Sequence, residues 1–88
     1  MMISEEKISN LREELAAIEH ERWSHWQIYL HGKCEINDDG SLTIPKDLVE
    51  QWERQSRTDF KDLEEKEKES DREQVDKYLP ILKNFFEE

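Results

Sequence analysis

The sequence is poor in the residues that build special sites: it has one cysteine, two glycines and two prolines. A single cysteine, Cys34, excludes an internal disulfide and a cysteine-based zinc site. With only Gly32 and Gly40, the chain cannot form a glycine-rich phosphate-binding loop. No apolar run approaches the roughly 20 residues needed to cross a bilayer, and the acidic N-terminus does not resemble a signal peptide. We therefore expect a soluble, cytoplasmic protein with no membrane partner.

Hydrophobic residues are also scarce, at 34% of the chain against 41% charged residues. The length accommodates one domain. This composition leans towards disorder, but three Trp, three Phe and two Tyr supply large side chains to bury. We expect a folded domain with a thin core, for which association into a homodimer or higher homo-oligomer would add stability.

Basic residues are outnumbered, because 13 Lys and Arg face 23 Asp and Glu, for a formal net charge of −10. Such a field repels phosphate backbones, so duplex nucleic acid is not an expected partner. A small anionic ligand is not excluded, because a local pocket of arginines overrides the global sign.

The periodicity of the apolar residues predicts a mostly α fold, a small domain of three to four helices with a short β-hairpin or extended loop in the middle. The first helix is expected over residues 4–30, with Ser4 as its N-cap and His31-Gly32 at its end. One face of this helix carries an apolar stripe of Ile8, Leu11, Leu15, Ile18, Trp26 and Tyr29.

The segment "CEINDDGSLTIP" predicts the hairpin or loop, within residues 33–45, because two short apolar alternations flank a turn sequence that ends at Gly40. Pro45 suits the first position of a second helix over residues 46–56. A third helix is expected over residues 64–86, with a kink or a split near Pro80, because proline cannot donate the helical hydrogen bond. All these elements belong to one domain over residues 1–88.

Two ionisable residues interrupt the apolar stripes. Arg22 falls within the stripe of the first helix, and Asp71 lies on the backward extension of the stripe of the last. A lone buried charge costs several kcal/mol, so we expect Arg22 to meet Asp71 across the helix interface. The pair is either a structural latch that fixes the register of the helices, or one side of a pocket in which Asp71 orients Arg22 towards an anion.

Other polar and aromatic residues fit a pocket as well as an ordinary surface. Trp23 could stack on a flat ring while His20 and Gln27 hydrogen-bond to it. Trp52 with Arg54 and Arg57 could supply a second wall. The alternative is that His20 is simply solvated and that the tryptophans are simply core.

Catalysis has little support in the sequence. The three histidines do not share a helical face with carboxylates at metal-ligand spacing. Cys34 has His31 three positions before it, but no third group to orient the pair. We expect no enzymatic activity, no metal and no cofactor.

Two motifs resemble the RyR domain, the small module named after the ryanodine receptor. "HERW" matches the family's His-x-x-Trp, at His20 and Trp23, and "DFKDLEEKEKESDR" matches its second signature. In that signature Phe60 replaces the usual tyrosine, and the remaining matches are Leu63, Glu67, Lys68, Asp71 and Arg72. The family's Gly-Trp-x-Tyr-Gly segment is missing here.

The resemblance implies a compact helical module that occurs alone in bacteria and their phages and binds nucleotide-derived small molecules without catalysis. We therefore expect a non-enzymatic module that senses or sequesters such a ligand. The expected ligand-binding residues are His20, Arg22, Trp23, Gln27, Trp52, Arg57, Phe60, Lys68, Asp71 and Arg72. The alternatives are an acidic helical protein-interaction adaptor or homodimerisation module without a ligand, and a nucleic-acid mimic built on the acidic surface.

Overall fold

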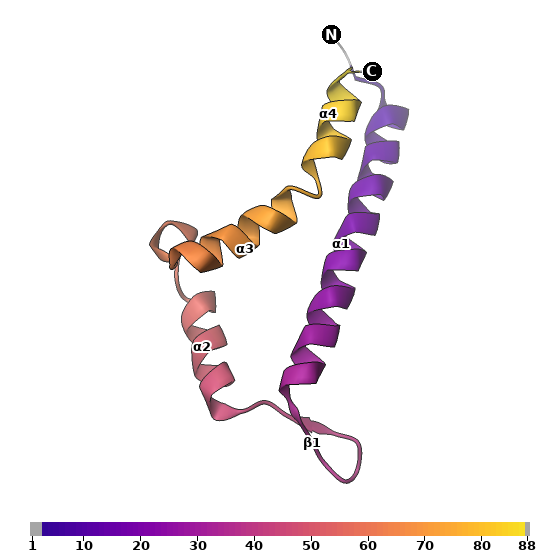
Figure 1. Ribbon diagram of the computed structural model, residues 1–88. Coiled ribbons are helices and arrows are strands. Elements are labelled where there is room, and N and C mark those ends of the chain that lie inside the picture. The colour runs from indigo at the N-terminus through magenta and orange to yellow at the C-terminus, as the bar shows by residue number, and fades with distance from the viewer. Residues whose placement is uncertain (1–2, 88) are drawn as a thin grey trace.

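A computed structural model of the chain describes residues 3–87, which form helices and one short hairpin (Figure 1). In chain order the elements are α1 (Glu5–Lys33), β1 (Glu35–Ile36), β2 (Leu42–Thr43), α2 (Lys46–Ser56), the 3₁₀ turn η1 (Phe60–Asp62), α3 (Glu65–Val75) and α4 (Leu79–Glu87). The prediction of a small, mostly α domain with a central hairpin is confirmed. No helix of the described residues is both long enough and apolar enough to cross a membrane.

Helix α1 begins as its sequence indicates and ends later. The Ser4 side chain accepts a hydrogen bond from the Lys7 backbone N–H at 3.2 Å, and the acidic first turn suits the positive end of the helix dipole. The helix continues to Lys33, beyond the predicted end at residue 30. Gly32 does not adopt a positive φ and therefore does not terminate the helix; the chain instead becomes extended at Cys34 to enter β1.

The hairpin is as short as its sequence suggests. Strands β1 and β2 are antiparallel, with Glu35 opposite Thr43 and Ile36 opposite Leu42. Gly40 has a φ of +88°, in the left-handed region that favours glycine, and this conformation closes the turn. The side chain of Asn37 donates to the hydroxyls of Ser41 and Thr43, both at 3.0 Å, so the hairpin satisfies its own polar groups.

In the C-terminal half the last predicted helix is split rather than kinked. Helix α2 spans residues 46–56, with Pro45 as its N-cap rather than its first residue. The segment predicted as a helix over residues 64–86 is divided into α3 and α4, with a turn at residues 76–78. Pro80 explains the break, because a continuous helix would require its missing N–H and would press its ring against the carbonyl of Asp76.

The helices enclose an open triangle rather than a bundle (Figure 1). Helix α4 lies beside the first half of α1, so the start of α1 and the end of α4 are neighbours (Figure 1). Helix α3 leads away from α1, and α2 returns towards the hairpin. At the far end of α1 the rings of Trp26 and Trp52 meet edge to face, with centroids 5.3 Å apart, and this contact joins α2 to α1.

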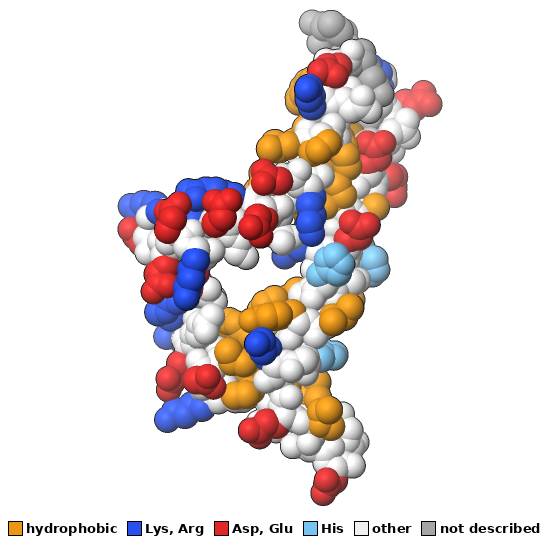
Figure 2. Space-filling model, in the orientation of Figure 1, with side chains coloured by type: hydrophobic (Ala, Val, Ile, Leu, Met, Phe, Trp, Pro, Cys, Tyr) orange, Lys and Arg blue, Asp and Glu red, His pale blue; other side chains and the backbone are white. Residues whose placement is uncertain are grey.

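Half-buried apolar side chains gather in two places, one at each end of α1 (Figure 2). The α1–α4 cluster consists of Leu11, Leu15, Ile18, Tyr78, Ile81, Leu82 and Phe85. The α1–α2 cluster consists of Leu30, Leu48, Val49 and Trp52. No apolar side chain among the described residues is fully buried. The predicted stripe of α1 is therefore only partly covered: Ile8, Trp26 and Tyr29 remain 51%, 41% and 48% exposed.

A candidate ligand-binding cavity

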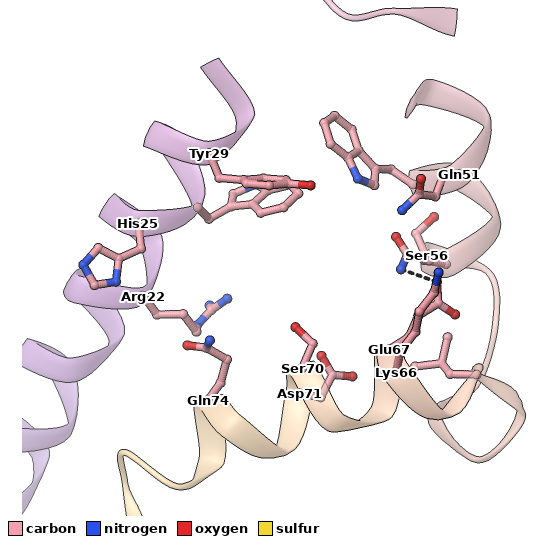
Figure 3. Close-up of a pocket in the computed structure, with 14 residues that line it drawn as sticks. Arg22, His25, Tyr29, Gln51, Ser56, Lys66, Glu67, Ser70, Asp71 and Gln74 are labelled. Carbon is pink, nitrogen blue, oxygen red and sulfur yellow. Dashed lines mark hydrogen bonds between the residues drawn. The ribbon is translucent and has the colours of Figure 1, made fainter. Parts of the chain in front are cut away.

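A cavity of about 770 Å³ lies between α1, α2 and α3 (Figure 3). Figure 2 shows it as an opening between the two apolar clusters. Helix α1 contributes Arg22, His25, Trp26 and Tyr29; α2 contributes Gln51, Trp52, Gln55 and Ser56; Leu63, Lys66, Glu67, Ser70, Asp71 and Gln74 complete the wall. Its volume falls within the range of about 300–1,000 Å³ that is usual for small-molecule sites.

Aromatic rings form one wall of this cavity. Tyr29 stacks on Trp26, with ring centroids 5.6 Å apart and planes inclined by 29°. Trp52 meets Trp26 at 67° from the opposite helix. The three rings are held by one another and by helix backbones, and Trp26 and Tyr29 keep large exposed faces. Such a surface accepts a flat ring.

Arg22 lies at the cavity, but its ion pair differs from the predicted one. Its guanidinium donates to the carboxylate of Glu19, three residues earlier on α1, and the Tyr78 hydroxyl donates to the same carboxylate. These two donors lower the pKa of Glu19 to about 2. Among the described residues no ion pair joins Arg22 to Asp71. The reason is proximity, because Glu19 is one helical turn from Arg22, whereas α3 diverges from α1 (Figure 1).

Helix α3 supplies the polar floor of the cavity. Ser70 and Asp71 point into it, and Gln74 faces Arg22 across the gap between α3 and α1 (Figure 3). Asp71 has no hydrogen bond or ion pair with the described residues. His25 belongs to the lining but its ring projects away from the interior (Figure 3). The floor thus presents an unpaired carboxylate, a hydroxyl and an amide, which are groups that recognise hydroxyls and amines.

Glu67 is a buried charged residue that lines the cavity. It matches the RyR signature but is not among the expected ligand-binding residues. Only 9% of it is exposed, and it accepts hydrogen bonds from Arg54 at 2.8 Å and from the Gln55 amide. It also accepts from the backbone N–H of Glu64 at 3.2 Å, which completes a capping box at the start of α3. The Arg54 guanidinium is the main cause of its lowered pKa. The Glu64-x-x-Glu67 spacing was the signal for the cap, but nothing in the sequence identified Arg54 as the partner.

Three of the predicted residues from α1 and its surroundings lie away from this cavity. His20 and Trp23 stack on each other, with centroids 6.0 Å apart, on another face of α1, and Trp23 is 55% exposed. Gln27 is half-buried and does not line the cavity. The predicted mouth around Trp23 is therefore separate from the cavity in which Trp52 lies.

The predicted residues that follow α2 form another separate group. Lys68 and Arg72 lie over the ring of Phe60, with Nζ and Cζ 5.9 Å and 5.8 Å from its centroid. Arg72 also pairs with Glu65 at 2.7 Å and Glu69 at 3.2 Å. None of these residues lines the cavity.

Arg57 is likewise outside the cavity. Its side chain is 80% exposed and lies 3.9 Å from Glu53. Of the ten predicted residues, the cavity therefore brings together Arg22, Trp52 and Asp71. The described residues contain no group of three or more His, Cys, Asp or Glu arranged to hold a metal ion.

Comparison with protein-family models, curated proteins and solved structures finds no match to this chain. The resemblance to the RyR domain therefore stays a prediction from its two motifs.

Proposed function

We propose that this protein binds a nucleotide-derived small molecule in the central cavity, and that it senses or sequesters the ligand without converting it. In this proposal it acts in the cytoplasm as a RyR-like module of bacterial or phage origin. The observation that carries the proposal is the composition of the cavity, which places an aromatic wall opposite polar groups within about 770 Å³. A nucleotide has the same division, with a flat base at one end and hydroxyl and phosphate groups at the other.

The aromatic wall suits the base. Stacking of a nucleobase on an aromatic side chain contributes about 1–3 kcal/mol and tolerates different bases. Gln51 lies beside this wall and has no hydrogen bond to the described residues, so its amide is free to pair with a base edge. These groups support recognition of a flat, hydrogen-bonding ring.

The opposite side suits the sugar and the phosphate. Asp71 and Ser70 can hydrogen-bond to ribose hydroxyls, since an unpaired carboxylate accepts from two donors at once. Arg22 has five N–H donors, and its pairing with Glu19 leaves several for a phosphate oxygen. Lys66 adds a second cation to the lining.

The test is a panel of adenine and guanine mononucleotides, cyclic mononucleotides and cyclic dinucleotides, with tryptophan fluorescence and melting temperature as readouts. A cognate nucleotide should quench the fluorescence, because Trp26 and Trp52 line the cavity. At a concentration a hundred times its Kd it should add about 2.7 kcal/mol to the free energy of unfolding. If no member of the panel changes either readout, the proposal is wrong.

Two variants test whether the nucleotide-induced changes in fluorescence and melting temperature arise from binding in the cavity. Arg22→Met should abolish the ligand-induced shift, whereas Arg57→Met, which also removes one arginine but outside the cavity, should retain it. The melting temperature of each free variant separates loss of binding from loss of folding. Equal responses from both variants would place the nucleotide elsewhere on the chain.

The second candidate is an acidic adaptor that docks a basic partner. The net charge of −10 and the exposed side chains of Ile28 and Phe86, 72% and 74% accessible, favour it. Salt-sensitive binding to a basic polypeptide, together with no response to nucleotides, is the result that would select this candidate.

A further inference from the structure

A second surface of α1, outside the central cavity, carries an open apolar groove of about 480 Å³. Its lining comes from α1 and from the turn before α4: Ile8, Leu11, Arg12, Leu15, Ala16 and Glu19, together with Tyr78. Trp23 continues the same side of the helix one turn beyond Glu19, because successive steps of four residues stay on one face. We name Ile8, Arg12, Ala16, Glu19 and Trp23 the α1 strip.

We propose that the α1 strip is the contact surface for a second copy of this chain, whose own α1 packs against it in the antiparallel direction. The twofold axis of this dimer lies next to Ala16. A twofold contact uses the same patch on both copies, so the strip must be complementary to itself. The charges and the side-chain sizes of the strip meet that requirement.

The surface area leaves room for an additional contact. The chain exposes 7550 Å², whereas a compact monomer of 10.7 kDa exposes about 5,500 Å². Its radius of gyration is 17.7 Å, against about 12 Å for a compact domain of this length. The excess is about 2,000 Å², and the open central cavity accounts for part of it.

The charges of the strip favour a contact with a second copy of the chain, and they favour the antiparallel direction. In a parallel pair Arg12 would face Arg12 and Glu19 would face Glu19, and both contacts repel. With the axis next to Ala16, Arg12 lies one turn before the axis and faces the part of the second copy one turn after it. There Trp23 offers a ring face, and Glu19 offers a carboxylate that also accepts from two donors of its own chain. Arg12 has no partner within the described residues of its own chain, so it is available for this contact.

The size of the side chains also fits. Ala16 is the smallest side chain of the strip and stands at the crossing point, where it lets the helix axes approach to about 8 Å. Ile8 and Trp23, which are 51% and 55% exposed, lie on either side and would be covered by the second copy. This contact leaves the lining of the central cavity unused, so it holds or fails independently of the proposed function.

Cysteine cross-linking tests the surface directly. In a Cys34→Ser background, Ala16→Cys places two thiols beside the axis, and mild oxidation should convert most of the protein into a disulfide-linked dimer. Ala17→Cys is the matched control, since the same change is made about 100° further around the helix, and it should stay monomeric on a denaturing gel. Equal cross-linking of both variants, or of neither, overturns the proposed strip.

Sedimentation equilibrium of the full chain supplies the second test. The native protein should be a dimer, and Arg12→Glu should weaken the dimer at least tenfold because four carboxylates then meet at the axis. Lys61→Glu changes the net charge by the same amount in the η1 turn and should leave the dimer constant unchanged. Circular dichroism confirms that both variants fold. A native protein that sediments as a monomer, or an Arg12→Glu variant that associates like Lys61→Glu, overturns the proposal.

Discussion

Arg22 lies within the apolar stripe of α1 and pairs with a carboxylate of its own helix. A cation within an apolar stripe demands a partner only if the stripe is buried, and here the Arg22 side chain remains 46% exposed. It therefore pairs with the nearest carboxylate, that of Glu19, and gains little stability from it, because solvent screens exposed ion pairs. Glu19 has the larger role, since Tyr78 also donates to it and so joins α4 to α1.

The acid sensitivity of the fold should depend on Glu19. Its pKa is about 2 instead of 4.5, so the charged carboxylate stabilises the folded state above pH 4.5, and this contribution disappears as the pH falls from about 4.5 to about 2. Glu19→Gln should reduce the loss of stability over this window, as measured by urea unfolding at a series of pH values. Glu13→Gln, which removes an exposed carboxylate from the same helix, should behave like the native protein; an identical response of both variants would contradict the assignment.

At the scale of elements, few contacts join the helices, and both apolar and polar ones occur. The ion pair of Arg54 with Glu67 links α2 to α3, and the capping box places Glu67 at the start of α3 at the same time. The turn at residues 76–78 then directs α4 back along α1 (Figure 1). The path of the chain around the cavity depends on these two features more than on apolar packing.

Replacing Glu67 should therefore loosen α2 from α3. Glu67→Gln keeps the size of the side chain but removes the charge that Arg54 and Gln55 recognise, and we expect the melting temperature to fall by several degrees. Glu73→Gln in the same helix has no partner to lose among the described residues and should change it little. Similar melting temperatures for the two variants would show that the buried carboxylate does not hold these helices together.

Helix starts and turns could be predicted from the sequence where residues close together in the chain determine them. Ser4, Gly40 and Pro45 indicated a helix start, a turn and the start of α2, because caps and turns depend on neighbours in sequence. The sequence could not show that Asp71 lacks a partner among the described residues, because this depends on how far α3 diverges from α1. The ion pair of Glu67 with Arg54 could not be predicted for the same reason. The spacing of Glu67 from Glu64 indicates a cap, but only the folded chain brings Arg54 to Glu67.

As a whole molecule, the chain combines a large surface with a net charge of −10. The charge opposes association, since two such molecules about 30 Å apart repel by on the order of 10 kcal/mol before salt screens them. The apolar area of the α1 strip favours association and is insensitive to this screening. The balance between the two terms depends on ionic strength.

Added salt should therefore strengthen the proposed dimer. Raising the salt concentration shortens the screening length from about 30 Å at 0.01 M to about 8 Å at 0.15 M, which removes most of the long-range repulsion. The contact of Arg12 with Glu19 of the second copy weakens at the same time, but one exposed pair contributes at most about 1 kcal/mol. Sedimentation at increasing salt measures the net effect; a dimer constant that weakens with salt would mean that ion pairs dominate the contact.

The separation of the two apolar clusters has a consequence for how the fold is lost. Both apolar clusters include residues of helix α1. The cavity between the clusters is lined on α3 by polar side chains, among them Ser70, Asp71 and Gln74. Melting of the α1–α2 end thus removes no apolar contact from the α1–α4 end. We therefore expect the two clusters to unfold separately, each with its own midpoint.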